Sequence, residues 1–145
     1  MKALIQRVTS ASVSVKGQQV GEIDRGLLVL LGIEKQDTEQ TIEKMANKLL
    51  AYRVFSDADG KMNLSVKDIN AGLLVVSQFT LAADTSKGLR PGFSNAAAPE
   101  IANEYYLKLV QKLRLECQQV ETGEFAADMQ VSLVNDGPVT FLLEC

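Results

Sequence analysis

The feature that most constrains the fold is a run of seven residues, Leu27 to Ile33, in which only Gly32 is not a large apolar residue. The run is far shorter than the roughly 20 residues that span a bilayer, so it predicts a buried strand. A strand without polar alternation is covered on both of its faces, as central strands are. A second such run, Leu73 to Val76, predicts another buried strand. We therefore expect a sheet with other elements packed against it.

Two further segments have apolar residues at the 3.6-residue spacing of amphipathic helices. We expect the first to begin at Asp37 as the N-cap, with Gln40 completing a capping box. We expect the second to begin at Pro99, because proline suits the first turn of a helix. The expected buried positions are Ile42, Met45, Ala46, Leu49 and Leu50 in the first helix, and Ile101, Ala102, Tyr105, Tyr106, Leu109, Val110 and Leu113 in the second.

The rest of the chain is dominated by strand patterns. Ala3 to Val15 predicts one long strand, Gln19 to Ile23 a short returning strand, and Met129 to Leu143 a last strand system. This order of elements predicts an α+β fold, in which a mixed or largely antiparallel sheet has two long helices packed against it. The length of 145 residues is that of one domain, which we expect to span residues 1–145.

The last strand system contains a Gly-Pro pair, Gly137-Pro138, within the segment Asn135 to Thr140. Proline cannot donate to a sheet ladder, so the backbone must bulge, turn or leave the sheet there. Bonds before proline are also the only peptide bonds that become cis at modest cost, about 0.5–1 kcal/mol. Two interpretations remain open from these residues: a turn that links strands, or a rigid backbone wedge that faces a ligand.

Composition removes several classes of mechanism. The sequence has no histidine, which excludes a His general base, a Ser-His-Asp triad and a His metal ligand. Cys117 and Cys145 form no Cys-x-x-Cys motif, so we expect both to be reduced in a cytoplasmic protein. A net charge of −3 argues against a broad nucleic-acid-binding surface, but not against contact with a single-stranded RNA end.

Two segments together carry a family resemblance. Ser77-Gln78-Phe79-Thr80-Leu81 ends the second buried run, and Asn135-Asp136-Gly137-Pro138-Val139-Thr140 interrupts the last strand system. In this order they resemble the two signature motifs of the D-aminoacyl-tRNA deacylases, the chiral proofreading enzymes. The opening residues Ala3 to Val8 and the loop Lys87 to Phe93 fit the same family, and the resemblance covers the whole chain without an obvious insertion.

The resemblance implies a cytoplasmic hydrolase with no metal and no cofactor. Such an enzyme would cleave the ester bond of D-aminoacyl-tRNA, and of glycyl-tRNA, as quality control in translation. The implied partners are the tRNA 3′ end carrying a D-amino acid or glycine and a second copy of the chain, with no membrane. In the homodimer, Gly137-Pro138 of each subunit would reach into the partner's site. The alternative from another class is a non-catalytic RNA- or nucleotide-binding module.

The two motifs and their surroundings supply the candidate site residues. No base lies within Ser77 to Leu81, so an alcohol nucleophile such as Thr80 would need one from elsewhere, such as Lys87 or Asp136. The stronger hypothesis is that backbone amides and hydroxyls bind an oxyanion, while the free ribose hydroxyl positions water. The catalytic candidates are Ser77, Gln78, Phe79 and Thr80, and the substrate-binding candidates are Gly137, Pro138, Val139, Thr140, Arg7, Lys87 and Arg90.

Four of these candidates have a second interpretation. Phe79 alone also fits a core residue at the end of a strand. Arg7 either locks the Gly-Pro backbone through its guanidinium donors or lies exposed on its strand. Residues 82–97 show no periodicity, as expected of a long loop that is either functional or disordered. Within them Lys87 and Arg90, with Phe93 nearby, either meet a phosphate and a base or are two solvated cations of a surface loop.

A rigid backbone also offers a way to distinguish the two chiral forms of a substrate. D- and L-aminoacyl esters differ only in the placement of the side chain and the hydrogen on the α-carbon. A backbone wedge excludes L-side chains by steric overlap, whatever their identity. We therefore predict that Gly137-Pro138 is a cis peptide whose backbone faces the α-carbon of the substrate. Glycine, which has no side chain, should escape rejection.

Overall fold

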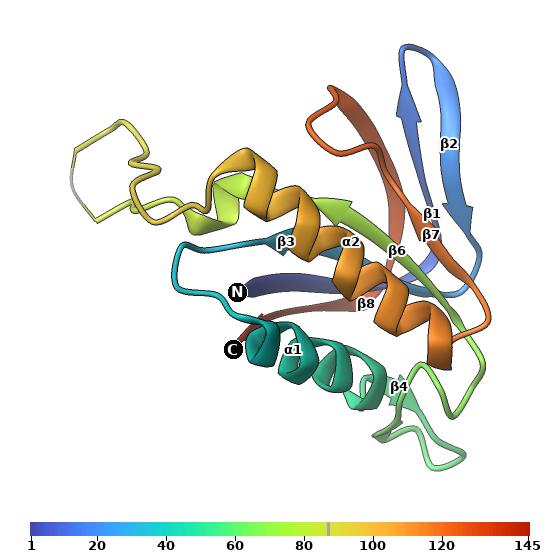
Figure 1. Cartoon of the computed structure of the whole chain (residues 1–145). Helices are drawn as coiled ribbons and strands as arrows, with labels where there is room; N and C mark the ends of the chain where they lie inside the picture. The colour runs from blue at the N-terminus through green and yellow to red at the C-terminus, as the bar shows by residue number, and fades with distance from the viewer. Residues whose placement is uncertain (87) are drawn as a thin grey trace.

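The computed structural model describes residues 1–86 and 88–145 and contains one mixed sheet with two helices on one face (Figure 1). The α+β class predicted from the sequence is therefore confirmed. The strands of the sheet are β1 (Lys2–Val15), β2 (Gln18–Ile23), β3 (Gly26–Gly32), β6 (Gly72–Ser77), β7 (Val120–Thr122) and β8 (Met129–Glu144). The remaining elements are the helices α1 (Glu39–Ala51) and α2 (Pro99–Glu116), the 3-10 turn η1 (Phe79–Ala82), and a separate ribbon of β4 (Phe55–Ser56) and β5 (Met62–Leu64).

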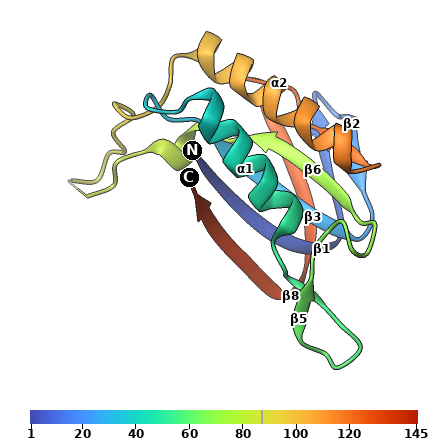
Figure 2. The same ribbon diagram turned by 60° about the horizontal axis from the view of Figure 1, so that its bottom comes forward.

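β1 is the strand around which the sheet is built. Its residues 2–8 pair antiparallel with β3 and its residues 11–15 with β2, while β8 runs antiparallel along its other side. β6 pairs parallel with β3, and β7 pairs parallel with β6. Within the described residues β8 pairs only with β1, so β8 forms an open edge of the sheet (Figure 2).

The two apolar runs are the neighbouring strands β3 and β6, and both faces of these strands are covered. Leu73 belongs to a core between the sheet and the two helices, whereas Leu74 belongs to a second core on the opposite face. The sheet curls over this second core, since a Cβ added at Gly21 on β2 would lie 2.6 Å from the carbonyl oxygen of Thr122 on β7. This double coverage explains why neither run alternates with polar residues.

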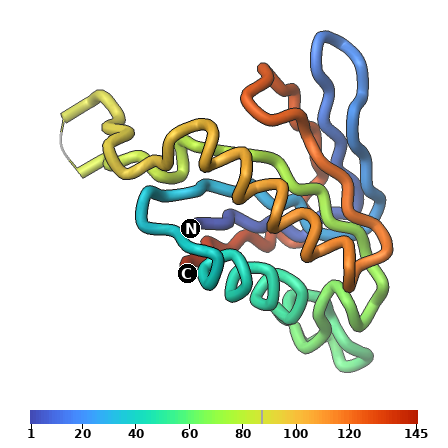
Figure 3. The backbone as a smooth tube through the Cα atoms, in the orientation of Figure 1, coloured from blue at the N-terminus to red at the C-terminus, as the bar shows by residue number. Residues whose placement is uncertain are grey.

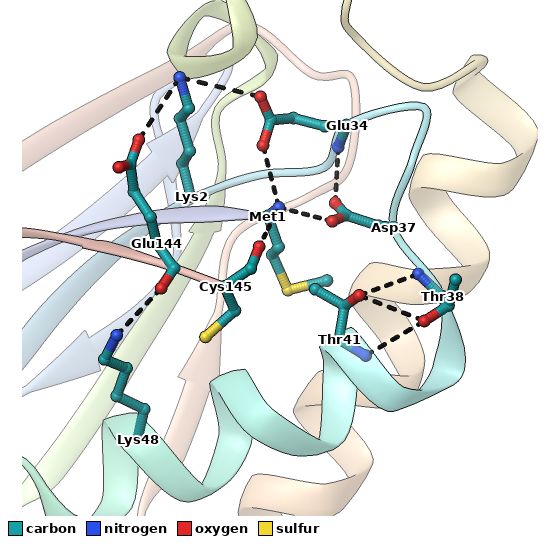
Figure 4. A network of polar contacts seen from close by, with 9 residues as sticks. All are labelled: Met1, Lys2, Glu34, Asp37, Thr38, Thr41, Lys48, Glu144 and Cys145. Carbon is teal, nitrogen blue, oxygen red and sulfur yellow. Dashed lines mark hydrogen bonds and ion pairs between the residues drawn. The ribbon is translucent and has the colours of Figure 1, made fainter.

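The N-terminus of α1 differs from the sequence prediction. Its N-cap is Thr38, which forms a capping box with Thr41. Asp37 is not the cap, because its carboxylate accepts from the terminal ammonium of Met1 at 2.5 Å and from the Glu34 amide at 2.7 Å (Figure 4). The predicted cap was wrong because the sequence does not show that Met1 lies beside Asp37. The five positions predicted to be buried in α1 are all buried.

The two ends of the chain lie side by side at one end of the sheet (Figure 3). The Met1 ammonium donates to the carbonyl of Cys145 at 3.1 Å, and the Cys145 amide donates back to the carbonyl of Met1 at 3.1 Å. Lys48 of α1 donates to the carbonyl of Glu144 at 2.9 Å. These contacts fasten β8 to both β1 and α1, so the open edge is held at its C-terminal end.

α2 begins at Pro99, as predicted, and five of its seven predicted positions are buried. Ile101 is instead 46% exposed, because Ala102 is the residue of the first turn that packs into the core, and Tyr105 is half-buried. Glu104 and Lys108, one helical turn apart on α2, form an ion pair, with Nζ to Oε1 at 2.7 Å. Lys108 and Lys112 also form ion pairs with α1. None of the helices in the described part of the chain is long and apolar enough to cross a membrane.

Tyr106 of α2 supports a prediction about stability at alkaline pH. Its side chain is buried, its hydroxyl donates to the Val75 carbonyl at 2.8 Å, and burial raises its pKa from 10.0 to about 12. The native state therefore favours the neutral phenol, and this stabilisation is fully present below about pH 10 and is lost as the pH rises to about 12. That rise in pKa corresponds to about 2–3 kcal/mol of the free energy of unfolding.

We expect wild-type protein to lose this stability between about pH 10 and pH 12, and Tyr106→Phe to lack that loss. The Val75 carbonyl still accepts from a second donor, the Gly123 amide, at 3.2 Å. The substitution should therefore lower the free energy of unfolding by only about 1 kcal/mol at neutral pH. Urea unfolding of both proteins across this pH range measures the difference. Parallel stability curves for the two proteins would contradict the expectation.

Candidate active site

The chain leaves the sheet at the end of β6 and enters η1. The Gln78 amide donates to the Leu31 carbonyl at 2.7 Å, which is the last backbone bond from this segment to the sheet. The first bond of η1 runs from the Leu81 amide to the Gln78 carbonyl at 3.2 Å. The N–H groups of Phe79 and Thr80 precede that bond, so neither has a partner within the turn.

A pocket of about 480 Å³ lies beside this turn. Its walls come from the end of β6, the start of α2, the loop after β7 and the beginning of β8, and most of the lining side chains are apolar. Asp128 is the only ionisable residue among the described residues that line it. The lining residues are Leu31, Ile33, Val76, Ser77, Gln78, Phe79, Ala96, Ala97, Pro99, Ala102, Phe125, Ala126, Ala127, Asp128, Met129 and Val131.

The hydroxyl of Thr80 is exposed and held by its neighbour. The amide nitrogen Nε2 of Gln78 donates to Oγ1 of Thr80 at 2.5 Å. An amide N–H cannot accept a proton, so this contact orients the hydroxyl without activating it as a nucleophile. Asp136, one of the two bases considered from the sequence, forms an ion pair with Arg7 at 3.4 Å on a different strand. Lys87, the other base, lies outside the described residues.

Phe79 does not occupy the core. Its side chain is 60% exposed, and its ring packs against Phe93 with 5.0 Å between the ring centroids. The interpretation of Phe79 as a buried residue at a strand end is therefore wrong. The reason is that β6 ends at Ser77, so the alternation of the strand no longer sets the direction of the side chain.

Gly137 and Pro138 lie in a bulge of β8. Gln6 pairs with Thr140 and Val8 with Asn135, so the backbone between these pairs bulges opposite Arg7. The peptide bond between the two residues is cis, as predicted from the sequence, and both residues are exposed. What this backbone faces stays a prediction.

The bulge is braced from both sides. Arg7, whose side chain is 12% exposed, donates through Nε to the carbonyl of Asp136 at 2.8 Å and through Nη1 to that of Val54 at 2.6 Å. The Asn135 side chain accepts from the Val139 amide at 2.7 Å and donates to Thr140 Oγ1 at 3.0 Å. Of the two interpretations of Arg7, the structure therefore shows the one in which its guanidinium locks the Gly-Pro segment.

The two motifs do not meet within one chain. In the strand register, Ser77 of β6 pairs with Leu31 of β3, and Leu31 pairs with Ala3 of β1. The bulge of β8 instead lies opposite Arg7 of β1. Four residues along β1 and three strand spacings across the sheet therefore separate the motifs, a distance of about 20 Å. A single subunit brings together Ser77, Gln78, Phe79 and Thr80, and separately Arg7, Gly137, Pro138, Val139 and Thr140.

The loop that follows η1 projects from the body of the molecule (Figure 1). Arg90 is exposed on this loop, and no contact places it in the pocket. Lys87, the other basic candidate, is outside the part of the chain that the structure describes. The base of the loop is fixed, because Asp84 and Gly92 exchange backbone hydrogen bonds at 2.7 and 3.0 Å.

Two parts of the site were missed from the sequence. Asn135 was within a signature motif but was not predicted to brace it, although asparagine side chains commonly hydrogen-bond to nearby backbone groups. The pocket wall formed by residues 125–129 has no periodic pattern and no motif that would have indicated it. Its position depends on the return of the chain from β7 to β8, which is a tertiary feature.

The comparisons with known proteins agree over the full length of the chain. The sequence matches the family model described as D-Tyr-tRNA(Tyr) deacylase over residues 4–144. Proteins named D-aminoacyl-tRNA deacylase from Saccharophagus degradans and Pseudomonas paraeruginosa are 63% identical over 143 residues and 61% identical over 145 residues. The matches cover 99% of both chains in the first case and 100% of both in the second.

Two solved structures share the fold. One, described as c-Myc DNA Unwinding Element Binding Protein, is 45% identical with a TM-score of 0.96, covering 100% of this chain and 99% of that chain. The other, described as a probable eukaryotic D-amino acid tRNA deacylase, is 15% identical with a TM-score of 0.82 and covers 98% of this chain and 97% of that chain.

Proposed function

The chain belongs to the D-Tyr-tRNA(Tyr) deacylase family, and on this basis we propose that it hydrolyses the ester bond between a D-amino acid and tRNA. The products are free tRNA and the free amino acid, and glycyl-tRNA is a second substrate. Residues 1–145 act as one deacylase-like domain, in the cytoplasm. The alternative, a non-catalytic nucleic-acid-binding module, is not favoured, because the relatives named for an activity are deacylases and the net charge is −3.

The observation that carries this function is the pocket beside η1, next to the two amides without a partner in the turn. The N–H groups of Phe79 and Thr80 are suited to receive the carbonyl oxygen of an ester as negative charge develops on it. A donor of this kind is typically worth about 10²–10³ in rate. The apolar lining of the pocket strengthens such an interaction, because it keeps bulk water away from the developing charge.

Water is the proposed nucleophile. Its oxygen attacks the ester carbonyl carbon, and the tetrahedral intermediate places its oxyanion on the two amides. The bond from the carbonyl carbon to the ribose oxygen then breaks, and the ribose oxygen takes up the proton that the water released. The free vicinal hydroxyl of the ribose orients this water, which suits a pocket whose described lining offers Asp128 as its only ionisable residue. Gln78 holds the Thr80 hydroxyl in place as a further donor.

A homodimer completes the proposed site. The Gly137-Pro138 segment is exposed, braced by Arg7 and Asn135, and about 20 Å from the Ser77–Thr80 motif of its own chain. A braced and exposed backbone is suited to insertion into a second subunit. The open edge of β8 also carries exposed apolar residues, Val134 at 56% and Leu142 at 53%, which favour association. Val139 and Thr140 position the segment, and Arg90 and Lys87 are proposed to meet the tRNA backbone.

The direct test is incubation of the purified protein with D-tyrosyl-tRNA, with L-tyrosyl-tRNA as the matched substrate. We expect release of D-tyrosine at low enzyme concentration and little release of L-tyrosine, read out by acid-gel separation of charged and free tRNA. Binding of the tRNA without any release of amino acid would instead support the non-catalytic module. Within the described residues the Thr80 hydroxyl contacts the Gln78 amide rather than a base, so trapping a covalent aminoacyl ester on Thr80 would contradict water as the nucleophile.

The net charge leads to a prediction about salt. With a charge of −3, the protein should neutralise few phosphates and grip only the end of the tRNA. We expect the slope of log affinity against log salt concentration to correspond to about 2–3 phosphate contacts rather than 6–10. Filter binding of tRNA from low to high salt measures the slope. A steep slope would mean that the protein also holds the body of the tRNA.

A further inference from the structure

Two exposed phenylalanines form a pair at the mouth of the pocket. The ring centroids of Phe79 and Phe93 are 5.0 Å apart, with an angle of 51° between the ring planes. Phe79 is 60% exposed and also lines the pocket, whereas Phe93 is 39% exposed and lies outside it. The pair therefore extends the apolar surface of the pocket outward, toward the projecting loop.

The exposure of this pair is built into the fold. Phe93 follows Gly92, which is bonded in both directions to Asp84, and its own carbonyl accepts from the Ala96 amide at 3.1 Å. The Asn95 carbonyl accepts from the Lys35 amide at 2.9 Å, which ties the same segment to the turn that follows β3. Two large apolar side chains are thus held in water beside a site, where nothing in the described part of the chain covers them.

We propose that Phe79 and Phe93 form a stacking surface for the nucleobase that precedes the terminal adenosine of tRNA, an inference that rests on the proposed deacylase function. Every tRNA ends in the single-stranded sequence cytidine-cytidine-adenosine. With the aminoacylated adenosine in the pocket, the chain of the RNA leaves through the mouth, where the aromatic pair lies. Stacking of unpaired bases on exposed aromatic rings is the usual mode of binding to single strands. Arg90 is exposed three residues before Phe93 and provides a cation for the adjoining phosphate.

The test compares two D-phenylalanyl esters, one of adenosine and one of the trinucleotide cytidine-cytidine-adenosine. Wild-type protein should hydrolyse the trinucleotide ester with a higher kcat/KM, by about 5- to 150-fold, as expected from one stacked base. Phe93→Ala and Phe93→Leu should lose most of this preference, while Phe93→Tyr should keep it, because only tyrosine retains an aromatic face. Leu89→Ala is the matched control, since Leu89 is a fully exposed apolar residue on the same loop.

A third substrate isolates the stacking contact. In the trinucleotide ester that lacks the middle base, the preference of wild-type protein should disappear, and Phe93→Ala should have no further effect on it. The inference is overturned if Phe93→Ala lowers kcat/KM equally for both esters, or if the ester without the middle base keeps the preference. If wild-type protein hydrolyses neither ester, the deacylase function fails instead. In that case the affinity for the uncharged trinucleotide, measured by calorimetry with and without its middle base, tests the stacking surface by itself. Equal affinities for the two would overturn it.

Discussion

Mixing two nearly inactive variants, Thr80→Ala and Gly137→Ala, should restore about a quarter of the wild-type deacylase activity. Random exchange of subunits makes half of the dimers mixed, and each mixed dimer has one of its two sites assembled from intact segments. This result follows only if each site combines the Ser77–Thr80 motif of one subunit with Gly137-Pro138 of its partner. If both motifs of a site belonged to the same chain, mixing would restore nothing.

Each variant alone should be impaired for its own reason. Thr80→Ala removes one hydroxyl held by Gln78 and should lower the rate by about 10²–10³ without abolishing turnover. Gly137 has φ +157°, and a Cβ there would lie 2.6 Å from the Val139 amide nitrogen. Gly137→Ala must therefore displace the bulge. A shift of about 1 Å at a catalytic site lowers the rate by about 10²-fold.

The control uses wild-type protein mixed with the double variant Thr80→Ala/Gly137→Ala. In this mixture neither site of a mixed dimer is intact, so activity should fall to about a quarter, whereas sites built within one chain would leave about a half. Sedimentation should show dimers of the 15.8 kDa chain for all variants, because neither change removes an exposed apolar side chain of β8 such as Val134 or Leu142. A fully active monomer would exclude the shared site.

The layers of the fold could be predicted from the sequence because they depend on local patterns. The runs of β3 and β6 lack alternation because both of their faces are buried, and the buried face of α1 follows from helical spacing. The cap of α1 was predicted one residue early, because the contact between Asp37 and Met1 joins residues that are far apart in sequence. The alternative placement of Phe79 in the core was wrong because nothing in the sequence marks the switch from β6 to η1.

Only part of the candidate site could be predicted from the sequence. Its two motifs were found by their resemblance to a family, and the bulge at Gly137-Pro138 follows from the chemistry of proline. Their separation in one chain depends on the strand order β8-β1-β3-β6, which no local pattern sets. The bracing of the bulge by Arg7 was one of two open interpretations, and burial of the guanidinium decided it.

The second large effect concerns chirality, and it follows from the same braced segment. Arg7 and Asn135 hold the exposed backbone of Gly137-Pro138 in one position, so it cannot yield to a substrate side chain. An L-side chain that points at this backbone must overlap with it, whatever its identity, whereas a D-side chain points away. One methylene group in a tight pocket already changes kcat/KM by about 10–200-fold. Exclusion of a whole side chain should therefore lower kcat/KM by more than about 10²-fold.

We therefore expect D-alanyl-tRNA to be hydrolysed more than about 10²-fold faster than L-alanyl-tRNA, and glycyl-tRNA to be hydrolysed at a rate close to that of the D-substrate. Glycine has no side chain to overlap with the backbone, so steric exclusion cannot reject it. Recognition by favourable contacts to a D-side chain would give the opposite result, because glycine lacks those contacts as well. Single-turnover deacylation of the three substrates distinguishes the two modes. Complete resistance of glycyl-tRNA, at enzyme levels that clear D-alanyl-tRNA, would show that the wedge is not the source of chiral selection.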